Sequence, residues 1–239
     1  LQATEDALGI QPSSQTLSLR KLALHAENLQ SHFLHLGYLV LPDLMGVPSV
    51  VPLAGTHKKE LTGLIKLHRL ANEFSRAICG RTTHPQRLIP GGFAKTPTAK
   101  ELQGVKDDLK GAGAELNAAA ELFASVADKL PDFTRPTEFV ALVSQAEYPL
   151  YWGQVGSSMD KRKPARFYKD VTKEYMVPQS SAKWAKNQTA SYMVGALARY
   201  NLNSERLSPT AKKVADMVGL TAPSSNPFHN NLAQLVECV

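Results

Sequence analysis

The sequence lacks a cysteine framework and any long apolar run. Two cysteines, Cys79 and Cys238, occur in 239 residues, too few for a set of structural disulfides and without CxxC spacing. No stretch reaches the roughly 20 apolar residues that cross a bilayer, and even residues 33–44 contain a histidine, a proline and an aspartate. We therefore expect a protein of a reducing compartment, the cytoplasm, with no membrane span.

Several common catalytic motifs are also missing. The phosphate-binding pattern GxxxxGK[ST] and the dinucleotide pattern GxGxxG are absent, which argues against a nucleotide-binding loop. The patterns GxSxG and HExxH are absent as well, so neither a hydrolase nucleophile elbow nor a zinc protease site is indicated.

The composition is that of a packed protein. Hydrophobic residues make up 43% and charged residues 20%, which excludes a collagen-like or wholly disordered chain, and the length fits a single domain over residues 1–239. The net charge is +6. A nucleic-acid surface requires clustered cations with aromatic residues among them. Only Lys-Arg-Lys-Pro-Ala-Arg at 161–166 comes close, and we interpret it as a solvated loop, so no nucleic-acid partner is expected.

Apolar residues recur at helical spacing in much of the chain. The spacing predicts a long helix over Leu17–Leu41, with Ser13 or Ser14 as N-cap and Pro42 beyond its end. A second helix is predicted over Lys58–Cys79, ended by Gly80. Three further helices are predicted over Thr98–Leu130 (with Thr98 and Glu101 in capping-box spacing), Pro209–Val218 and Pro227 to the end.

Residues of about 138–180 follow another pattern. Short runs rich in β-branched and aromatic residues alternate with turn residues there, at 139–143, 150–152 and 166–168. They predict a small antiparallel β insert. The predicted fold class is therefore mainly α (α+β), a bundle of long helices with one β insert.

Two places offer candidate functional side chains. His25, His32 and His35 lie three or seven residues apart in the first helix and could bind zinc or iron, but no cysteine or carboxylate stands at matching spacing, which favours buried structural histidines. The loop after the second helix carries an imidazole, His84, and further along a flexible diglycine at 91–92. It either lines an active site or closes the end of the bundle.

Several segments stand in a fixed order along nearly the whole chain: Ala-Leu-Gly-Ile-Gln-Pro at 7–12, Leu-Arg-Lys-Leu at 19–22, 26–35, 41–46, Gly-Arg with His-Pro at 80–85, Pro-Gly-Gly-Phe at 90–93, 194–201, and Asn-Pro with His-Asn-Asn-Leu-Ala at 226–233. Together they resemble the large (alpha) subunit of cytoplasmic nickel-iron hydrogenases. The order of the segments makes the resemblance more specific than any one of them. Ser31 before His32, where uptake enzymes tend to have aspartate, favours the sulfhydrogenase, coenzyme-reducing and bidirectional groups.

The resemblance implies a nickel-iron centre with cyanide and carbon monoxide ligands, held by four cysteine thiolates. Two CxxC motifs supply these thiolates in the family, and they would fall before Ala7 and after Val239. It also implies reversible oxidation of H2, with a small iron-sulfur subunit of hydrogenase and further electron-transfer subunits as partners. We therefore expect a central fragment that is catalytically silent alone and has no metal ligand of its own. The missing initiator Met and the abrupt end of the last helix agree with this expectation.

By family position, Ser31 and His32 are expected near the cluster, whereas His35, Asp43 and His84 are expected to brace the packing around it. None of the five is expected to bind the metal. The alternative hypothesis is a non-catalytic helical scaffold, like the ligand-free large-subunit relatives in respiratory complex I.

Overall fold

The computed structural model describes residues 1–160 and 162–239. The chain divides into two compact units, residues 1–122 with Cys238 and residues 123–237 with Val239. The boundary lies within α7 (Gly113–Ala124). The single domain over residues 1–239 stays a prediction, and each unit is described by itself.

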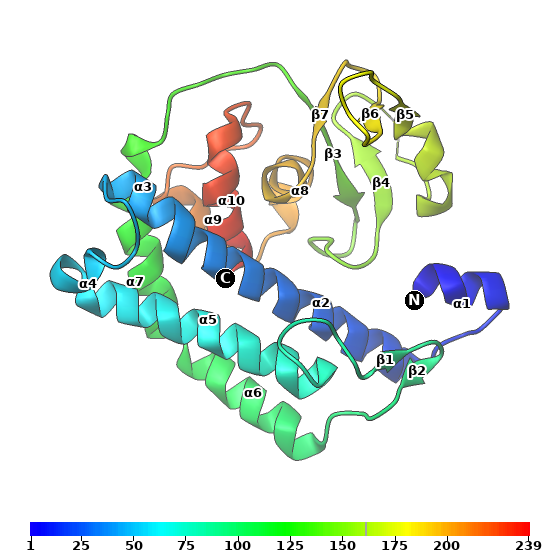
Figure 1. Cartoon of the computed structure of the whole chain (residues 1–239), viewed down its shortest axis with the longest axis horizontal. Helices are drawn as coiled ribbons and strands as arrows, with labels where there is room; N and C mark the ends of the chain where they lie inside the picture. Colours follow the sequence, from blue (N-terminus) through cyan, green and yellow to red (C-terminus); the bar gives the residue numbers. More distant parts are fainter. Residues whose placement is uncertain (161) are drawn as a thin grey trace. The chain divides into compact units, whose positions relative to one another are not determined.

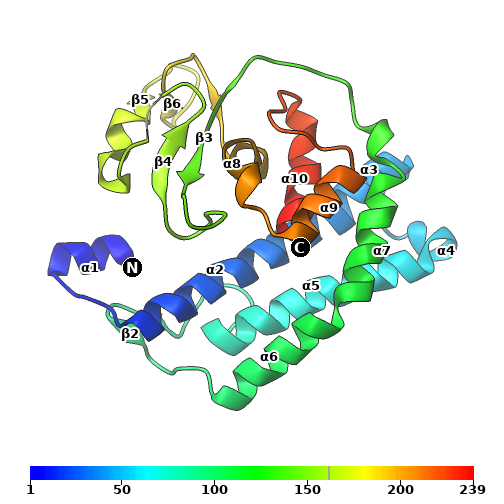
Figure 2. The same ribbon diagram turned by 180° about the vertical axis from the view of Figure 1, so that it is seen from behind.

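The first unit is built on three long helices. α2 (Ser14–Leu34) and α5 (Lys58–Cys79) lie side by side, and α6 (Ala99–Gly111) packs along α5 (Figure 1). Figure 2 shows the same three helices from behind. The smaller elements of this unit are α1 (Gln2–Leu8), the π-helical η1 (His35–Val40), α3 (Leu41–Met45), α4 (Leu53–Thr56), β1 (Leu88–Ile89) and β2 (Gly92–Phe93).

α5 has the bounds that the sequence predicts. It ends at Gly80, whose φ of 82° is a left-handed conformation that glycine adopts without strain. Its buried residues follow three- and four-residue steps, so one face is covered along the whole helix. They include Leu61, Leu64, Leu67, Ala71, Phe74 and Ile78.

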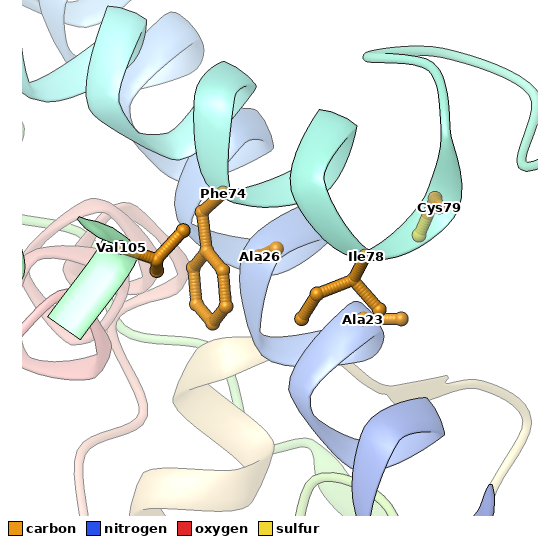
Figure 3. Packing of buried hydrophobic residues seen from close by; sticks show 6 residues of the cluster. All are labelled: Ala23, Ala26, Phe74, Ile78, Cys79 and Val105. Carbon is orange, nitrogen blue, oxygen red and sulfur yellow. The ribbon is translucent and has the colours of Figure 1, made fainter. Parts of the chain in front are cut away.

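The core of the first unit lies where α2, α5 and α6 meet. Figure 3 shows the small side chains of Ala23 and Ala26 on α2 next to Phe74 and Ile78 of α5. Val105 of α6 packs against the same cluster. Because alanine lets two helix backbones approach closely, the larger side chains of α5 are enclosed, and each contributes roughly 1.5–3 kcal/mol by leaving water.

The first helix is longer than predicted and changes type near its end. Ser13 caps it by accepting a hydrogen bond from the amide of Thr16. Helical backbone continues through η1 and α3 to Met45, so the prediction that Pro42 lies beyond the helix was wrong. The amide of Leu41 bonds to the carbonyl of Leu36, five residues back, and Pro42 stands in the first turn of α3. A first turn tolerates proline because its N–H groups need no partner inside the helix.

The third predicted helix is two helices. The capping box is confirmed, since Thr98 and Glu101 each accept from the other's amide at the start of α6. α6 ends at Gly111, and α7 begins at Gly113. Two glycines within three residues weaken a helix enough for the chain to turn there.

The second unit combines short strands with short helices. Its larger sheet has the order β4-β3-β7, in which β3 (Glu138–Val143) pairs antiparallel with β4 (Gln154–Ser157) and parallel with β7 (Tyr192–Met193). A separate antiparallel ribbon pairs β5 (Lys173–Tyr175) with β6 (Trp184–Lys186). The helices are η2 (Ala127–Lys129), η3 (Ala165–Asp170), α8 (Ala196–Asn203), η4 (Ser204–Arg206), α9 (Pro209–Met217), η5 (Pro227–His229) and α10 (Asn230–Glu237).

The β insert differs from the prediction in four respects. It extends to Met193, and its last strand is parallel to β3. Residues 166–168 form the 3-10 helix η3 after Pro164, and residues 150–152 form bends after Pro149. In both places a proline restricts the backbone just before a run whose composition favours a strand. Lys161 lies outside the described residues.

Candidate functional site

The five residues expected near a metal cluster all fall in the first unit, but their surroundings differ. His32, in the last turn of α2, is buried, and His35, the first residue of η1, is half-buried. Ser31, Asp43 and His84 are exposed. Because His32 belongs to an α-helix and His35 begins a π-helical turn, the backbone hydrogen-bond pattern changes between the two histidines. Such irregular turns are frequent at functional sites.

The structure does not join these residues into a metal-binding cluster. Across residues 1–160 and 162–239, no three His, Cys, Asp or Glu side chains are grouped closely enough to hold a metal ion. The zinc or iron alternative for His25, His32 and His35 gains no support from this geometry. The roles of the five residues stay predictions.

The loop after α5 is anchored at its start. The amides of Gln86 and Arg87 both donate to the carbonyl of Cys79, at 3.0 and 3.1 Å, which folds the loop back onto the helix end. Arg87 Nη1 donates to the carbonyl of Ala77 at 2.8 Å. A Cβ on Gly80 would lie 2.9 Å from Cγ of Arg87, so glycine is required there by space as well as by its φ.

The far end of this loop is held by a buried ion pair. Arg20 of α2 and Glu5 of α1 are each 3% exposed, and two contacts of 2.6 and 2.7 Å join the guanidinium to the carboxylate. Arg20 also donates to the carbonyl of Ile89 at 3.0 Å, and the amide of Gly91 donates to Glu5 at 2.6 Å. One carboxylate and one guanidinium thus fasten α1, α2 and the β1–β2 turn together.

The ion pair determines the charge state of Glu5. The hydrogen bond from Arg20, opposed by burial and aided by the amide of Gly91, lowers the pKa of Glu5 to about 2. The carboxylate is therefore ionised at any physiological pH. His84, which has a φ of 57°, thus lies in a loop that is fixed at both ends, rather than in a free lid.

Both cysteines of the chain are thiols in buried positions. Cys79 and Cys238 are both buried, and burial raises the pKa of the Cys79 thiol. A thiol held in its protonated form is a poor ligand, because metals bind the thiolate. That neither cysteine replaces a family ligand stays a prediction.

The second unit contains two buried carboxylates that sequence reasoning missed. Glu138, at the start of β3, accepts from the Ser157 hydroxyl, the Asn187 side chain and the amides of Gln188 and Thr189. Burial alone would raise the pKa of Glu138, but these four donors outweigh it and lower the pKa. The carboxylate fixes the chain that leads into β7 to the β3–β4 pair.

Glu237, at the end of α10, is the second carboxylate. It binds Arg199 of α8 through two contacts and accepts from the Tyr148 hydroxyl at 2.7 Å. Burial, together with the neighbouring carboxylate, raises the pKa of Tyr148 well above its ordinary value.

The sequence held a signal for two of these buried charged residues. Glu138 stands at the start of a β-rich run, and Arg20 stands on the apolar stripe of a helix. Sequence spacing gives no signal for the residues with which they form hydrogen bonds.

Two segments that carry the family resemblance are hydrogen-bonded to each other. The Asn230 side chain accepts from the amide of Leu197 at 3.1 Å and so caps the start of α8. Asn201 exchanges two hydrogen bonds with the backbone of Ser224, at 2.8 and 2.9 Å, and the Ser224 hydroxyl lies 2.8 Å from Nδ1 of His229. Segments 194–201 and 226–233 thus form one structural motif.

Sequence comparison relates the whole chain to curated proteins. No family model matches the chain. The alpha subunit of sulfhydrogenase 1 from Pyrococcus furiosus is 30% identical over 240 residues, covering 100% of this chain and 56% of its own length. The alpha subunit of sulfhydrogenase 2 from the same organism is 28% identical, and the matching subunit of the F420-non-reducing hydrogenase vhc from Methanococcus voltae is 25% identical. Along its whole length, this chain is similar in sequence to hydrogenase alpha subunits. It spans about half the length of these curated relatives.

Solved structures give the same fold. The match to the NAD+-reducing [NiFe]-hydrogenase has a TM-score of 0.80 at 22% identity, covering 95% of this chain and 57% of that one. The match to the [NiFeSe]-hydrogenase of Dm. baculatum has a TM-score of 0.64 at 16% identity. The predicted resemblance to hydrogenase large subunits and the mainly α fold class are confirmed. No helix in the described part of the chain is long and apolar enough to cross a membrane.

Proposed function

We propose that this chain is the central part of the catalytic large subunit of a nickel-iron hydrogenase, an enzyme that oxidises H2 reversibly to protons and electrons. The observation that carries the proposal is the match to hydrogenase alpha subunits along the whole chain, at 30% identity over 240 residues. The TM-score of 0.80 to a nickel-iron hydrogenase supports it independently, since that comparison uses the fold.

The residues described here do not by themselves fit a nickel-iron centre. Such a centre needs a set of soft thiolate ligands. The two cysteines are single and buried, and the described residues form no cluster of metal-binding side chains. No catalytic step is therefore assigned to this chain. In the proposal, the thiolates come from the CxxC motifs that flank this region in the family, and the cyanide and carbon monoxide ligands belong to that complete centre.

The contribution proposed for this chain is the packing around the centre. His32 is the one buried side chain among the five residues expected there. In the proposal, the loop that contains His84 also belongs to this packing. The Glu5–Arg20 ion pair fixes the position of that loop. The proposed partners, in the cytoplasm, are the small iron-sulfur subunit of hydrogenase and further electron-transfer subunits, with H2 as substrate.

The gene on either side of this segment provides the direct test. We expect an in-frame CxxC motif on each side. The complete reading frame, produced together with the hydrogenase maturation machinery, should contain about one nickel per chain, as a single catalytic centre requires, and reduce a dye with H2. Residues 1–239 alone, produced in the same way, should do neither.

Two outcomes would contradict the proposal. A reading frame without flanking CxxC motifs would favour the helical scaffold. Chelation-resistant nickel bound by residues 1–239 alone would show that the ligands lie within this chain.

A further inference from the structure

The positive charge of the chain is concentrated in one short segment. Residues 160–186 contain eight lysines and arginines but only three acidic residues, so they carry +5 of the chain's net charge of +6. The remainder of the chain is almost neutral. The segment comprises η3, β5 and β6 of the second unit, which lie next to one another in Figure 1.

The β5–β6 ribbon places two of these cations opposite each other. Lys173 pairs with Lys186, and Tyr175 pairs with Trp184 two residues along. Since side chains alternate across a strand, all four lie on one face of the ribbon. Glu174 lies on the other face, where it pairs with Lys183 at 2.9 Å. In the described part of the chain, neither Lys173 nor Lys186 forms an ion pair with a carboxylate.

Two like charges directly across a strand pair destabilise the pair. The backbone register holds them there, and the Tyr175 ring, 5.3 Å from Nζ of Lys186, provides a favourable contact for one of the two ammonium groups. An external carboxylate would be attracted by both lysines. The ribbon therefore attracts an anionic group, and no carboxylate of residues 1–160 or 162–239 pairs with either lysine.

The same region exposes residues that are typical of protein interfaces. Trp184 is 46% exposed, and Phe167 of η3 is equally exposed with Arg166 over its ring at 5.0 Å. Tryptophan, tyrosine and arginine are enriched among the residues that dominate protein–protein binding. Strands that bind single-stranded nucleic acid instead present successive free ring faces for stacking. Here cations already occupy the faces of Phe167 and Tyr175.

We propose that the ribbon face formed by Lys173, Tyr175, Trp184 and Lys186 docks an acidic surface of a partner protein, another subunit of the same enzyme. The identity of the partner as a subunit rests on the proposed function. The preference for a carboxylate-rich protein surface rests on the lysine pair and the exposed aromatic residues alone.

The test uses residues 1–239 and a fluorescein-labelled oligoglutamate peptide of about 20 residues, with binding followed by fluorescence anisotropy at about 50 mM salt, where charge attraction is weakly screened. The double variant Lys173→Gln/Lys186→Gln should bind the peptide about tenfold more weakly. Lys58→Gln/Lys59→Gln, which removes the same charge from two exposed lysines of α5, should change binding less than about twofold. In a Trp152→Phe background, Trp184 is the only tryptophan, and its emission should change when the peptide binds.

One further variant separates binding from folding. Lys173→Glu should weaken peptide binding but leave the urea midpoint unchanged or raise it, because it replaces a like-charge pair with a cross-strand ion pair. If both double variants lost the same amount of peptide affinity, binding would depend on the overall charge of the chain alone, and the proposal would be overturned. Tighter binding of a labelled dT oligonucleotide that is lost in Trp184→Ala would instead identify a nucleic-acid surface. The assay needs neither metal nor H2, so its outcome is independent of whether the chain belongs to an active hydrogenase.

Discussion

Arg199 of α8 and Glu237 of α10 form a two-point ion pair, with Nε–Oε1 at 2.6 Å and Nη2–Oε2 at 2.7 Å. The Glu237 side chain is 1% exposed, and the Arg199 side chain is 21% exposed. The two residues are 38 positions apart in the sequence, and the helices that carry them also pack on each other. Replacing one partner should therefore cost more than removing both.

We predict that Glu237→Gln lowers the free energy of unfolding by about 3–5 kcal/mol, because Arg199 is left without its counter-charge in a largely buried position. The double variant Arg199→Met/Glu237→Gln should cost less than the sum of Arg199→Met and Glu237→Gln measured singly. Urea denaturation of the four proteins measures the coupling. The exposed pair Glu73–Arg76 on α5 is the matched control, and Glu73→Gln should cost less than about 1 kcal/mol. Additive single changes would show that the buried pair is not coupled.

The Glu5–Arg20 pair predicts a pH dependence. The pKa of Glu5 is lowered to about 2 from an ordinary value of 4.5, so this carboxylate stabilises the folded state above about pH 4.5 and loses that effect as the pH falls toward 2. Glu5→Gln should remove part of the loss of stability between pH 5 and pH 3. Asp6→Asn, an exposed neighbour, is the control and should keep the parental slope. The same slope in Glu5→Gln as in the parent would show that the ion pair does not govern acid stability.

The elements that could be predicted from sequence are those determined by local spacing. α5 has its predicted bounds because its apolar stripe, its length and Gly80 all agree. The capping box could be predicted because Thr98 and Glu101 are only three positions apart in the sequence. α1 and α8 were not predicted as helices. Each is held by a distant side chain, the first by Arg20 and the second by Asn230.

The candidate site shows the same limit. The sequence singled out histidines, whereas the structure's strongest buried polar contacts involve carboxylates that meet partners 15 to 89 residues away. The π-helical turn at His35 and the continuation through Pro42 also depend on hydrogen-bond register, which residue type alone does not specify. The family resemblance indicated the fold, but it could not show that Ser31 is exposed whereas His32 is buried.

Gly80 is predicted to be sensitive to the smallest substitution. Gly80→Ala places a Cβ in a left-handed residue and 2.9 Å from Cγ of Arg87, so it should cost about 1–2 kcal/mol. Gly104→Ala is the control, because it lies within α6 with nothing within 4 Å of the added Cβ. It should gain about 0.5–1 kcal/mol. Thermal melts of both variants test this prediction. Equal shifts of the melting temperature would show that Gly80→Ala introduces no strain.

Phe74 should carry much of the stability of the first unit. It is 4% exposed between α2 and α6, and Phe74→Ala should lower the free energy of unfolding by about 3–5 kcal/mol (Figure 3). Ile65 is the comparison on the same helix, since it is 44% exposed and Ile65→Ala should cost less than about 1 kcal/mol. Similar losses at both positions would mean that this face of α5 is not the core.

The last prediction concerns His32 in the complete enzyme, with both flanking segments present. A buried imidazole beside a metal centre orients ligands and tunes the metal through its hydrogen bonds, and its loss typically costs 10- to 100-fold in activity or affinity, so His32→Gln should lower H2 oxidation per intact cluster by about that factor. His57→Gln serves as the control, because that ring contacts the hydroxyl of its exposed neighbour Thr56 at the end of α4. If His32 only satisfies a polar group in the helical core, its replacement should instead lower stability and leave turnover per nickel unchanged. Measuring metal content, melting temperature and H2-dependent dye reduction on the same preparations separates the two roles, and parental turnover at full metal content would leave His32 a purely structural residue.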